Sequence, residues 1–155
     1  MIFVTVGTQF PFDRLIRIVD KLAPQLEEPI VAQIYTTRYK PKHITAVDFM
    51  SPAEMDKYIE DASLIICHAG MGSIISALMK NKPFVIFPRK KELCEHTTNH
   101  QLATAEKMKA LGFCEVAYTE EELIDYVLRK EHKPLKTLKE IASRSLIEAI
   151  KADIG

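Results

Sequence analysis

The chain has 155 residues, 47% of them hydrophobic, and its 21 Lys and Arg residues balance its 21 Asp and Glu residues. This length and composition fit one compact domain with a hydrophobic core and exclude a disordered chain. Because the formal net charge is zero, no general electrostatic attraction favours nucleic acid or an anionic membrane as a partner.

Short β-rich runs alternate with longer helical stretches, a pattern typical of a parallel sheet covered by helices. In chain order, the predicted elements are a strand over 2–6, a helix over 12–22, strands over 30–35 and 44–49, a helix over 51–61, a strand over 64–67, a helix that ends near 80, a strand over 84–87, a helix over 98–111, a strand over 113–116, and helices over 120–129 and 135–152. We therefore predict an α/β fold in which residues 1–155 form a single doubly wound, Rossmann-like domain. Ligands of such folds bind beyond the carboxyl ends of the strands.

Some helix boundaries have clear signals. Ser51 can cap the helix that follows it, Pro52 suits the first helical position, and Glu54 completes a capping box. Gly112 is predicted to stop the helix before it. The last predicted helix, 135–152, carries an apolar stripe, for which core packing is the expected role and docking onto a partner the alternative.

No segment predicts export or membrane insertion. The N-terminal run reaches a glycine after six residues and is interpreted as a buried strand rather than a signal peptide. No apolar run approaches the roughly 20 residues that cross a bilayer, so we expect any membrane anchor to come from another chain. The three cysteines share no CxxC spacing, which favours reduced cytosolic thiols over a disulfide or a metal site.

The loop after the first predicted strand contains Gly7 and Thr8. A glycine at this place lets a ligand approach the backbone closely, and the threonine adds a hydroxyl group. An ordinary turn between a strand and a helix would use the same residue types, so this motif alone leaves both interpretations open.

The sequence His-Ala-Gly-Met-Gly-Ser follows the fourth predicted strand. Its two glycines expose backbone N–H groups at the positive end of the next helix, an arrangement that holds a diphosphate without net positive charge. The candidate diphosphate-binding residues are Gly70, Met71, Gly72 and Ser73. This loop is neither the GxGxxG fingerprint nor a P-loop, since no Gly-Lys-Ser/Thr follows. His68 could contact the same ligand, although a lone histidine is more often packed in a core.

The loop that follows the fifth predicted strand is dense in polar groups. Asn99 and Gln101 have amides that suit sugar hydroxyls, and Glu95 can accept from two hydroxyls at once. His96 and His100 lie four residues apart and could ligate a metal, but without a clear third ligand the hydroxyl-binding interpretation is favoured. If each residue is considered alone, the alternative interpretation is a solvent-exposed loop followed by a helix cap.

The order of these motifs resembles the C-terminal, donor-binding half of family 28 glycosyltransferases, which have the two-domain GT-B fold. The motifs that carry the resemblance are Gly7-Thr8, His68-Ala-Gly-x-Gly-Ser73, Lys82-Pro83, Pro88, Glu95-His96 and Asn99-His100-Gln101. The chain is similar above all to the catalytic subunit of the split UDP-N-acetylglucosamine transferase of N-glycan assembly, and to subunits of split bacterial exopolysaccharide and capsule transferases. The match spans roughly residues 1 to 117.

The resemblance implies a UDP-sugar donor as substrate and assigns residues to its parts. By this analogy, Phe49 and Met50 lie near the uracil, Gly7, Thr8, Gly70, Met71, Gly72 and Ser73 near the diphosphate, and Asn99, His100 and Gln101 at the donor sugar. It also implies no metal and no other cofactor, because relatives of this fold stabilise the leaving diphosphate with a helix dipole and side-chain donors. The chain accordingly has no Asp-x-Asp motif.

Sugar transfer needs a base for the acceptor hydroxyl as well as a site for the donor. His68 is a candidate for contacting the leaving phosphate or assisting proton transfer, and Glu95 and His96 are alternative acid or base candidates. Related sequences carry an acidic residue on the helix after the glycine loop, where it holds the ribose hydroxyls. Ser76 stands at the corresponding position here, which leaves ribose binding and donor identity open.

A complete GT-B enzyme has two α/β domains with the active site between them, and this chain accounts for one. The resemblance therefore implies a membrane-anchored partner subunit that binds a lipid-linked saccharide acceptor, with this chain cytoplasmic and held at the membrane through that partner. The transferred group would be a hexose or an N-acetylhexosamine. Two alternatives stay open: a non-catalytic nucleotide-sugar-binding or scaffold subunit, which Ser76 favours, and a self-sufficient homodimeric hydrolase or epimerase of UDP-sugars.

Overall fold

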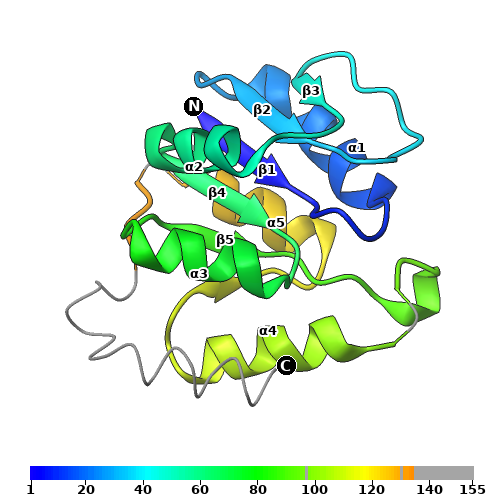
Figure 1. The fold of residues 1–155 in the computed structure, drawn as a ribbon, viewed down its shortest axis with the longest axis vertical. Helices are drawn as coiled ribbons and strands as arrows, with labels where there is room; N and C mark the ends of the chain where they lie inside the picture. Colours follow the sequence, from blue (N-terminus) through cyan, green and yellow to red (C-terminus); the bar gives the residue numbers. More distant parts are fainter. Residues whose placement is uncertain (97, 130, 135–155) are drawn as a thin grey trace.

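The computed structural model describes residues 1–96, 98–129 and 131–134. Within this part of the chain, six parallel strands form one sheet in the order β3-β2-β1-β4-β5-β6 (Figure 1). The strands are β1 (Ile2–Thr5), β2 (Ile30–Gln33), β3 (Thr45–Val47), β4 (Leu64–Cys67), β5 (Phe84–Ile86) and β6 (Glu115–Val116). The predicted α/β class with a parallel, Rossmann-like sheet is confirmed.

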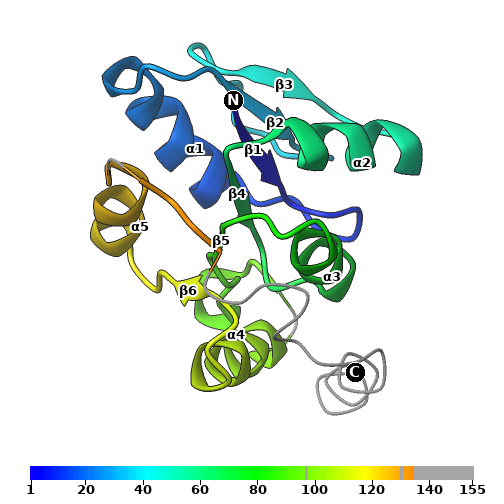
Figure 2. The ribbon, with the colours of Figure 1, turned by 90° about the vertical axis from the view of Figure 1, so that its left-hand side faces the viewer.

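Helices cover both faces of this sheet. In chain order, the described helices are α1 (Asp13–Leu22), the 3-10 turn η1 (Ala23–Gln25), α2 (Pro52–Asp61), α3 (Met71–Met79), the 3-10 turn η2 (Lys91–Leu93), α4 (His100–Ala110) and α5 (Glu120–Val127). Figure 2 shows α1 and α5 on one side of the sheet, with α2 and α3 on the other. The predicted helix over 135–152 lies outside the described residues. None of the helices described is long and apolar enough to cross a membrane.

The hydrophobic core has two layers because successive residues of a strand point to opposite faces of the sheet. Ile2 and Val4 of β1 pack in a cluster with Leu15 of α1, whereas Phe3, between them, packs with Ile59 of α2. Both layers are buried. The central strands are therefore continuous hydrophobic runs, as expected for a parallel sheet with helices on both faces.

The predicted helix signals are borne out at two boundaries and shifted at a third. The Ser51 hydroxyl accepts the backbone N–H of Glu54 at 3.2 Å, which caps α2. Gly112 follows α4 with a φ of +73°, a conformation that suits glycine. Helix α4 begins at His100 rather than near Thr98, because the Thr98 hydroxyl accepts the backbone N–H of His100 and forms a local turn first.

The strand order determines which loops meet. Strands β1, β4 and β5 are neighbours in the sheet, and their carboxyl ends lie at the same edge because all three run parallel. The loop that contains Gly7, the loop that contains His68 and the loop that begins at Phe87 therefore converge at one place. This is the edge at which ligands bind in open α/β sheets.

Candidate functional site

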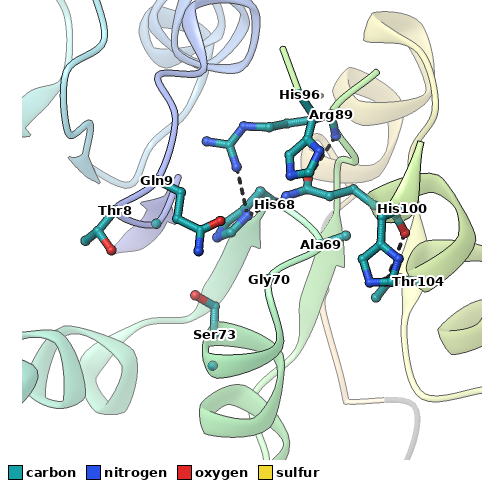
Figure 3. Close-up of a pocket in the computed structure, with 13 residues that line it drawn as sticks. Thr8, Gln9, His68, Ala69, Gly70, Ser73, Arg89, His96, His100 and Thr104 are labelled. Carbon is teal, nitrogen blue, oxygen red and sulfur yellow. Dashed lines mark hydrogen bonds between the residues drawn. The ribbon is translucent and has the colours of Figure 1, made fainter. Parts of the chain in front are cut away.

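A cavity of about 360 Å³ opens where the loops after β1, β4 and β5 meet (Figure 3). Its lining comes from all three loops: Gly7, Thr8 and Gln9 after β1, then His68, Ala69, Gly70, Gly72 and Ser73 after β4, then Arg89, His96, His100, Gln101 and Thr104 after β5. Three motifs that are far apart in the sequence thus supply the walls of one cavity.

The amino end of α3 forms part of this cavity. Gly70 is the residue that precedes the helix, and no side chain caps it. The first backbone N–H groups of a helix have no partner within the helix. A Cβ atom built on Gly72 would meet no other atom within 4 Å, so the space beside these N–H groups is open. An anionic group can therefore approach the positive end of α3 directly.

The ring of His68 lies between the two glycine loops. A Cβ atom on Gly7, which has a φ of +76°, would come within 2.7 Å of Nε2 of this ring, and one on Gly70 would come closer still to its Cε1. The ring thus occupies the space that side chains at these two positions would need. Both glycines are therefore needed for the close packing of this ring, whereas the sequence analysis assigned them to the approach of a ligand.

The other ring nitrogen of His68, Nδ1, faces two side chains from the loop after β5. Nη1 of Arg89 lies 3.0 Å from it (Figure 3), and Nε2 of Gln101 lies 3.2 Å from it. Burial lowers the pKa of His68 to about 3, and the nearby charge of Arg89 and, to a smaller extent, His96 act in the same direction. The imidazole is therefore neutral at physiological pH.

Arg89 is a buried cation whose part in the site the sequence reasoning missed. Its side chain is 1% exposed, and its Nη2 donates to the carbonyls of Val6 at 2.7 Å and Phe10 at 2.6 Å. Burial lowers the pKa of Arg89 to about 10, while the charge of Glu95 raises it, so the guanidinium is protonated at neutral pH. The available signal was an arginine at the end of a buried strand, directly after Pro88.

Glu95, predicted as an acid or base candidate, is engaged in an ion pair outside the cavity lining. Both of its oxygens accept from Arg14, at 2.8 Å each, and one also accepts the backbone N–H of Lys90 at 3.0 Å. Its side chain is 10% exposed. Glu95 therefore joins the loop after β5 to α1, which a sequence cannot show because the two residues are 81 positions apart.

The two histidines of this loop, His96 and His100, both line the cavity. His96 packs edge-on against Phe10, with ring centroids 5.0 Å apart, and its Nδ1 accepts the backbone N–H of Thr98 at 3.2 Å. Within the described part of the chain, no group of three or more His, Cys, Asp or Glu side chains is placed to hold a metal ion. The two histidines thus have no third ligand there.

The amides predicted to meet the donor sugar have partners within the protein. The carbonyl of Gln101 accepts the backbone N–H of Arg89 at 3.1 Å, and its amino group contacts His68. Asn99 lies outside the cavity lining, where its amide contacts the backbone N–H of Lys91 at 3.1 Å and the carboxylate of Glu92 at 3.0 Å. Of the three predicted sugar contacts, the structure therefore brings His100 and Gln101 to the cavity.

The residues predicted near the uracil do not line this cavity. Phe49 is 64% exposed, and Met50 is 5% exposed and packs in the core cluster with Phe3. Ser76, at the position where related sequences carry an acid, is half-buried on α3 and lies outside the lining as well. The cavity thus unites the predicted diphosphate residues more completely than the predicted nucleoside residues.

Comparison with known proteins places the chain in a family. A family model described as the glycosyltransferase family 28 C-terminal domain matches residues 1–154. A UDP-N-acetylglucosamine transferase subunit, ALG13 of Candida albicans, is 38% identical over 89 residues, which are 57% of this chain and 29% of that protein. The chain thus spans less than a third of the length of this relative.

Two solved structures share the fold. The NMR solution structure of ALG13 aligns with a TM-score of 0.63 and 22% identity over 97% of this chain and 96% of that one. The glycotransferase of kitacinnamycin aligns with a TM-score of 0.60 and 16% identity over 98% of this chain and 38% of that one. The chain belongs to glycosyltransferase family 28, as a C-terminal domain of that family.

Proposed function

We propose that this chain is the donor-binding subunit of a UDP-sugar glycosyltransferase and that it holds the donor diphosphate at the amino end of α3. The observation that carries the proposal is the meeting of three features at one cavity: open backbone N–H groups, a neutral histidine and a glycine-lined approach. These groups are hydrogen-bond donors to an anion and need no metal. Family membership and the name of the Candida relative support a nucleotide-sugar substrate.

The roles of the individual groups follow from where they lie. The backbone around Gly72 and Ser73 and the Nε2 side of His68 would contact the diphosphate, while His96 and His100 line the part of the cavity that the loop after β5 forms. Stabilising the charge of the leaving diphosphate lowers the barrier to transfer. The donor sugar would lie between these two sides, with a hexose or an N-acetylhexosamine as the group transferred.

The cavity supplies donors for the diphosphate more clearly than it supplies a base for the acceptor hydroxyl. Among the described residues that line it, none is Asp or Glu, and Glu95 is held by Arg14. His96 remains a candidate base. We infer that a membrane-anchored partner subunit binds a lipid-linked saccharide acceptor and completes the active site, as in two-domain GT-B enzymes. The chain would then work at the cytoplasmic side of a membrane through that partner.

A transfer assay with a candidate acceptor-binding subunit tests this proposal. The two chains are expressed together and separately and supplied with a lipid-linked saccharide and, in turn, several UDP-sugars. We expect sugar transfer only when both chains are present and with one UDP-sugar favoured. A matched variant, Gly72→Asp, should abolish transfer in the pair, because its carboxylate would occupy the anion site.

The alternative functions give different results in the same assay. Release of UDP from a UDP-sugar by the isolated chain would contradict the proposal and favour a self-sufficient hydrolase. A partner complex that binds the acceptor and transfers sugar equally well with the Gly72→Asp variant would make this chain a scaffold, which is the alternative that Ser76 favours.

A further inference from the structure

The contacts of His68 specify which of its nitrogens carries a proton. We propose that Arg89 and Gln101 are positioning residues that hold His68 as the neutral tautomer with a proton on Nε2, so that it donates to the diphosphate and does not act as a base. This inference rests on the proposed function, since it names what one side of the anion site does.

Two hydrogen-bond donors lie beside Nδ1 of His68. The guanidinium of Arg89 has N–H donors and no acceptor, so its Nη1, at 3.0 Å, can only donate. The orientation of Gln101 is fixed by its carbonyl, which accepts the backbone N–H of Arg89 at 3.1 Å. Its amino group must then face Nδ1, at 3.2 Å. With two donors and no acceptor beside it, Nδ1 is unprotonated.

Contacts around the guanidinium of Arg89 hold this arrangement in place. The Nη2 atom of Arg89 donates to the carbonyls of Val6 and Phe10, and the guanidinium lies over the ring of Phe12 with its Cζ 4.9 Å from the centroid. These contacts prevent the guanidinium from turning away from His68. The titratable groups that act on His68 are Arg89 and His96, and Glu95 acts on Arg89 while it is paired with Arg14. A doubly protonated imidazole is disfavoured beside the fixed cation.

The proton of the neutral His68 ring lies on the nitrogen that faces the glycine loops. Since Nδ1 is an acceptor, a neutral ring carries its proton on Nε2. Nε2 lies on the side of Gly7 and Gly70, where any added Cβ atom would collide with it. Phosphate oxygens only accept hydrogen bonds, so an N–H group at this place matches them. The buried charge of Arg89, which lines the same cavity, adds positive potential at the anion site.

Nitrogen NMR of the free protein tests the tautomer directly. In protein labelled with 15N-histidine, long-range 1H–15N spectra distinguish protonated from unprotonated ring nitrogens, and a His68→Gln variant assigns the His68 signals. We expect an unprotonated Nδ1, a protonated Nε2 and no titration of this ring between about pH 5 and 8. A protonated Nδ1, or a titration near the ordinary value for histidine, would overturn the proposal.

A pair of variants tests the role of Gln101. Gln101→Glu replaces the donor that faces Nδ1 with an acceptor of the same shape. It should raise the pH at which the ring titrates by at least about one unit, because the added negative charge stabilises the protonated ring. Asn99→Asp makes the same chemical change two residues earlier, where the amide contacts Glu92 and Lys91, and should leave the His68 signals unchanged. Identical spectra for both variants and the wild type would refute the assigned role.

Addition of UDP separates this inference from the proposed function. UDP should shift the Nε2 signal of His68, whereas uridine at the same concentration should not. If UDP binds by calorimetry but leaves that signal unmoved, the inference fails while the nucleotide site stands. If UDP does not bind at all, the proposed function fails, and with it the purpose assigned to the tautomer.

Discussion

His68 owes its charge state to its surroundings. Its ring is 9% exposed, and the fixed guanidinium of Arg89 lies against one nitrogen. Both effects disfavour the imidazolium form, with burial the larger. A neutral imidazole still provides a hydrogen-bond donor, so the site keeps one without the cost of a second buried cation beside Arg89.

The pH dependence of stability should report this burial. In the unfolded chain His68 takes up a proton near pH 6.5, whereas in the folded protein its pKa is lowered to about 3. The unfolded state therefore binds more protons in this interval, and the free energy of unfolding should fall as the pH falls below about 6.5, by up to about 1.4 kcal/mol per pH unit. Denaturant unfolding at pH values from 7.5 to 5 measures this fall in the free energy of unfolding.

The control for this prediction is a His68→Gln variant. The stability difference between wild type and variant should shrink steadily as the pH is lowered, and the measurement stays above pH 4.5, the ordinary value for Glu28, whose pKa is lowered in the fold. A difference that is constant across this range would show that His68 is not buried in its neutral form.

At the scale of single residues, sequence reasoning selected the glycines and His68 as candidate site residues, because glycine and histidine in a loop directly after a strand are typical of ligand sites. It missed Arg89, because its place after a buried strand and Pro88 does not by itself show that the side chain is buried. Glu95 was predicted as an acid or base candidate because the sequence does not show its ion pair with Arg14, which lies in a distant helix. Long-range ion pairs are set by topology, and a sequence without its fold does not contain their distances.

At the scale of elements, an ion pair fixes the loop after β5 against α1. Arg14 donates to both oxygens of Glu95 and also to the carbonyl of Pro88 at 3.3 Å, and its guanidinium lies 4.4 Å from the ring centroid of Phe87. Parallel, paired hydrogen bonds of this kind give geometric specificity as well as energy. The wall of the cavity that carries His96 therefore depends on α1.

A double-mutant cycle measures this link. Arg14→Met, Glu95→Gln and the double variant should show a coupling energy of about 1–3 kcal/mol in unfolding experiments, because the pair is largely buried and bidentate. The pair Arg129 and Glu115, exposed and 3.7 Å apart, is the control and should show a coupling close to zero. Equal coupling in the two cycles would mean that the Arg14–Glu95 pair does not fix the loop.

The elements themselves were largely predictable. Hydrophobic runs and helical spacing identified the described strands and α-helices but not the 3-10 turns η1 and η2, and the Ser51 cap marked the start of α2 correctly. Strand β3 is shorter than predicted, Thr45–Val47 instead of 44–49. Chain order alone does not say how far a strand at the edge of the sheet stays paired. For the same reason the positions of Phe49 and Met50, just beyond it, could not be read from the sequence.

At the scale of the whole molecule, the described residues form one parallel α/β domain of the kind found in GT-B glycosyltransferase C-terminal domains. The solved glycotransferase of kitacinnamycin shares this fold over 38% of its own length. The sequence predicted the fold class and the family, because three motifs in one order carry both. The cavity at the carboxyl edge of the sheet offers donors for an anion and lacks a carboxylate among its described lining residues, which fits the proposal that a partner subunit supplies the base.

Calorimetric titration of UDP into the isolated chain tests the central claim, that the amino end of α3 holds the diphosphate. The wild type should bind UDP more tightly than uridine. Gly72→Asp should weaken UDP binding at least about tenfold, because its carboxylate repels the diphosphate, while an acidic residue in the first turn supports the helix and keeps the chain folded. Gly72→Ala, whose Cβ enters open space, should weaken it far less. Equal UDP affinity in wild type and Gly72→Asp, or no UDP binding with or without a partner subunit, would contradict the account.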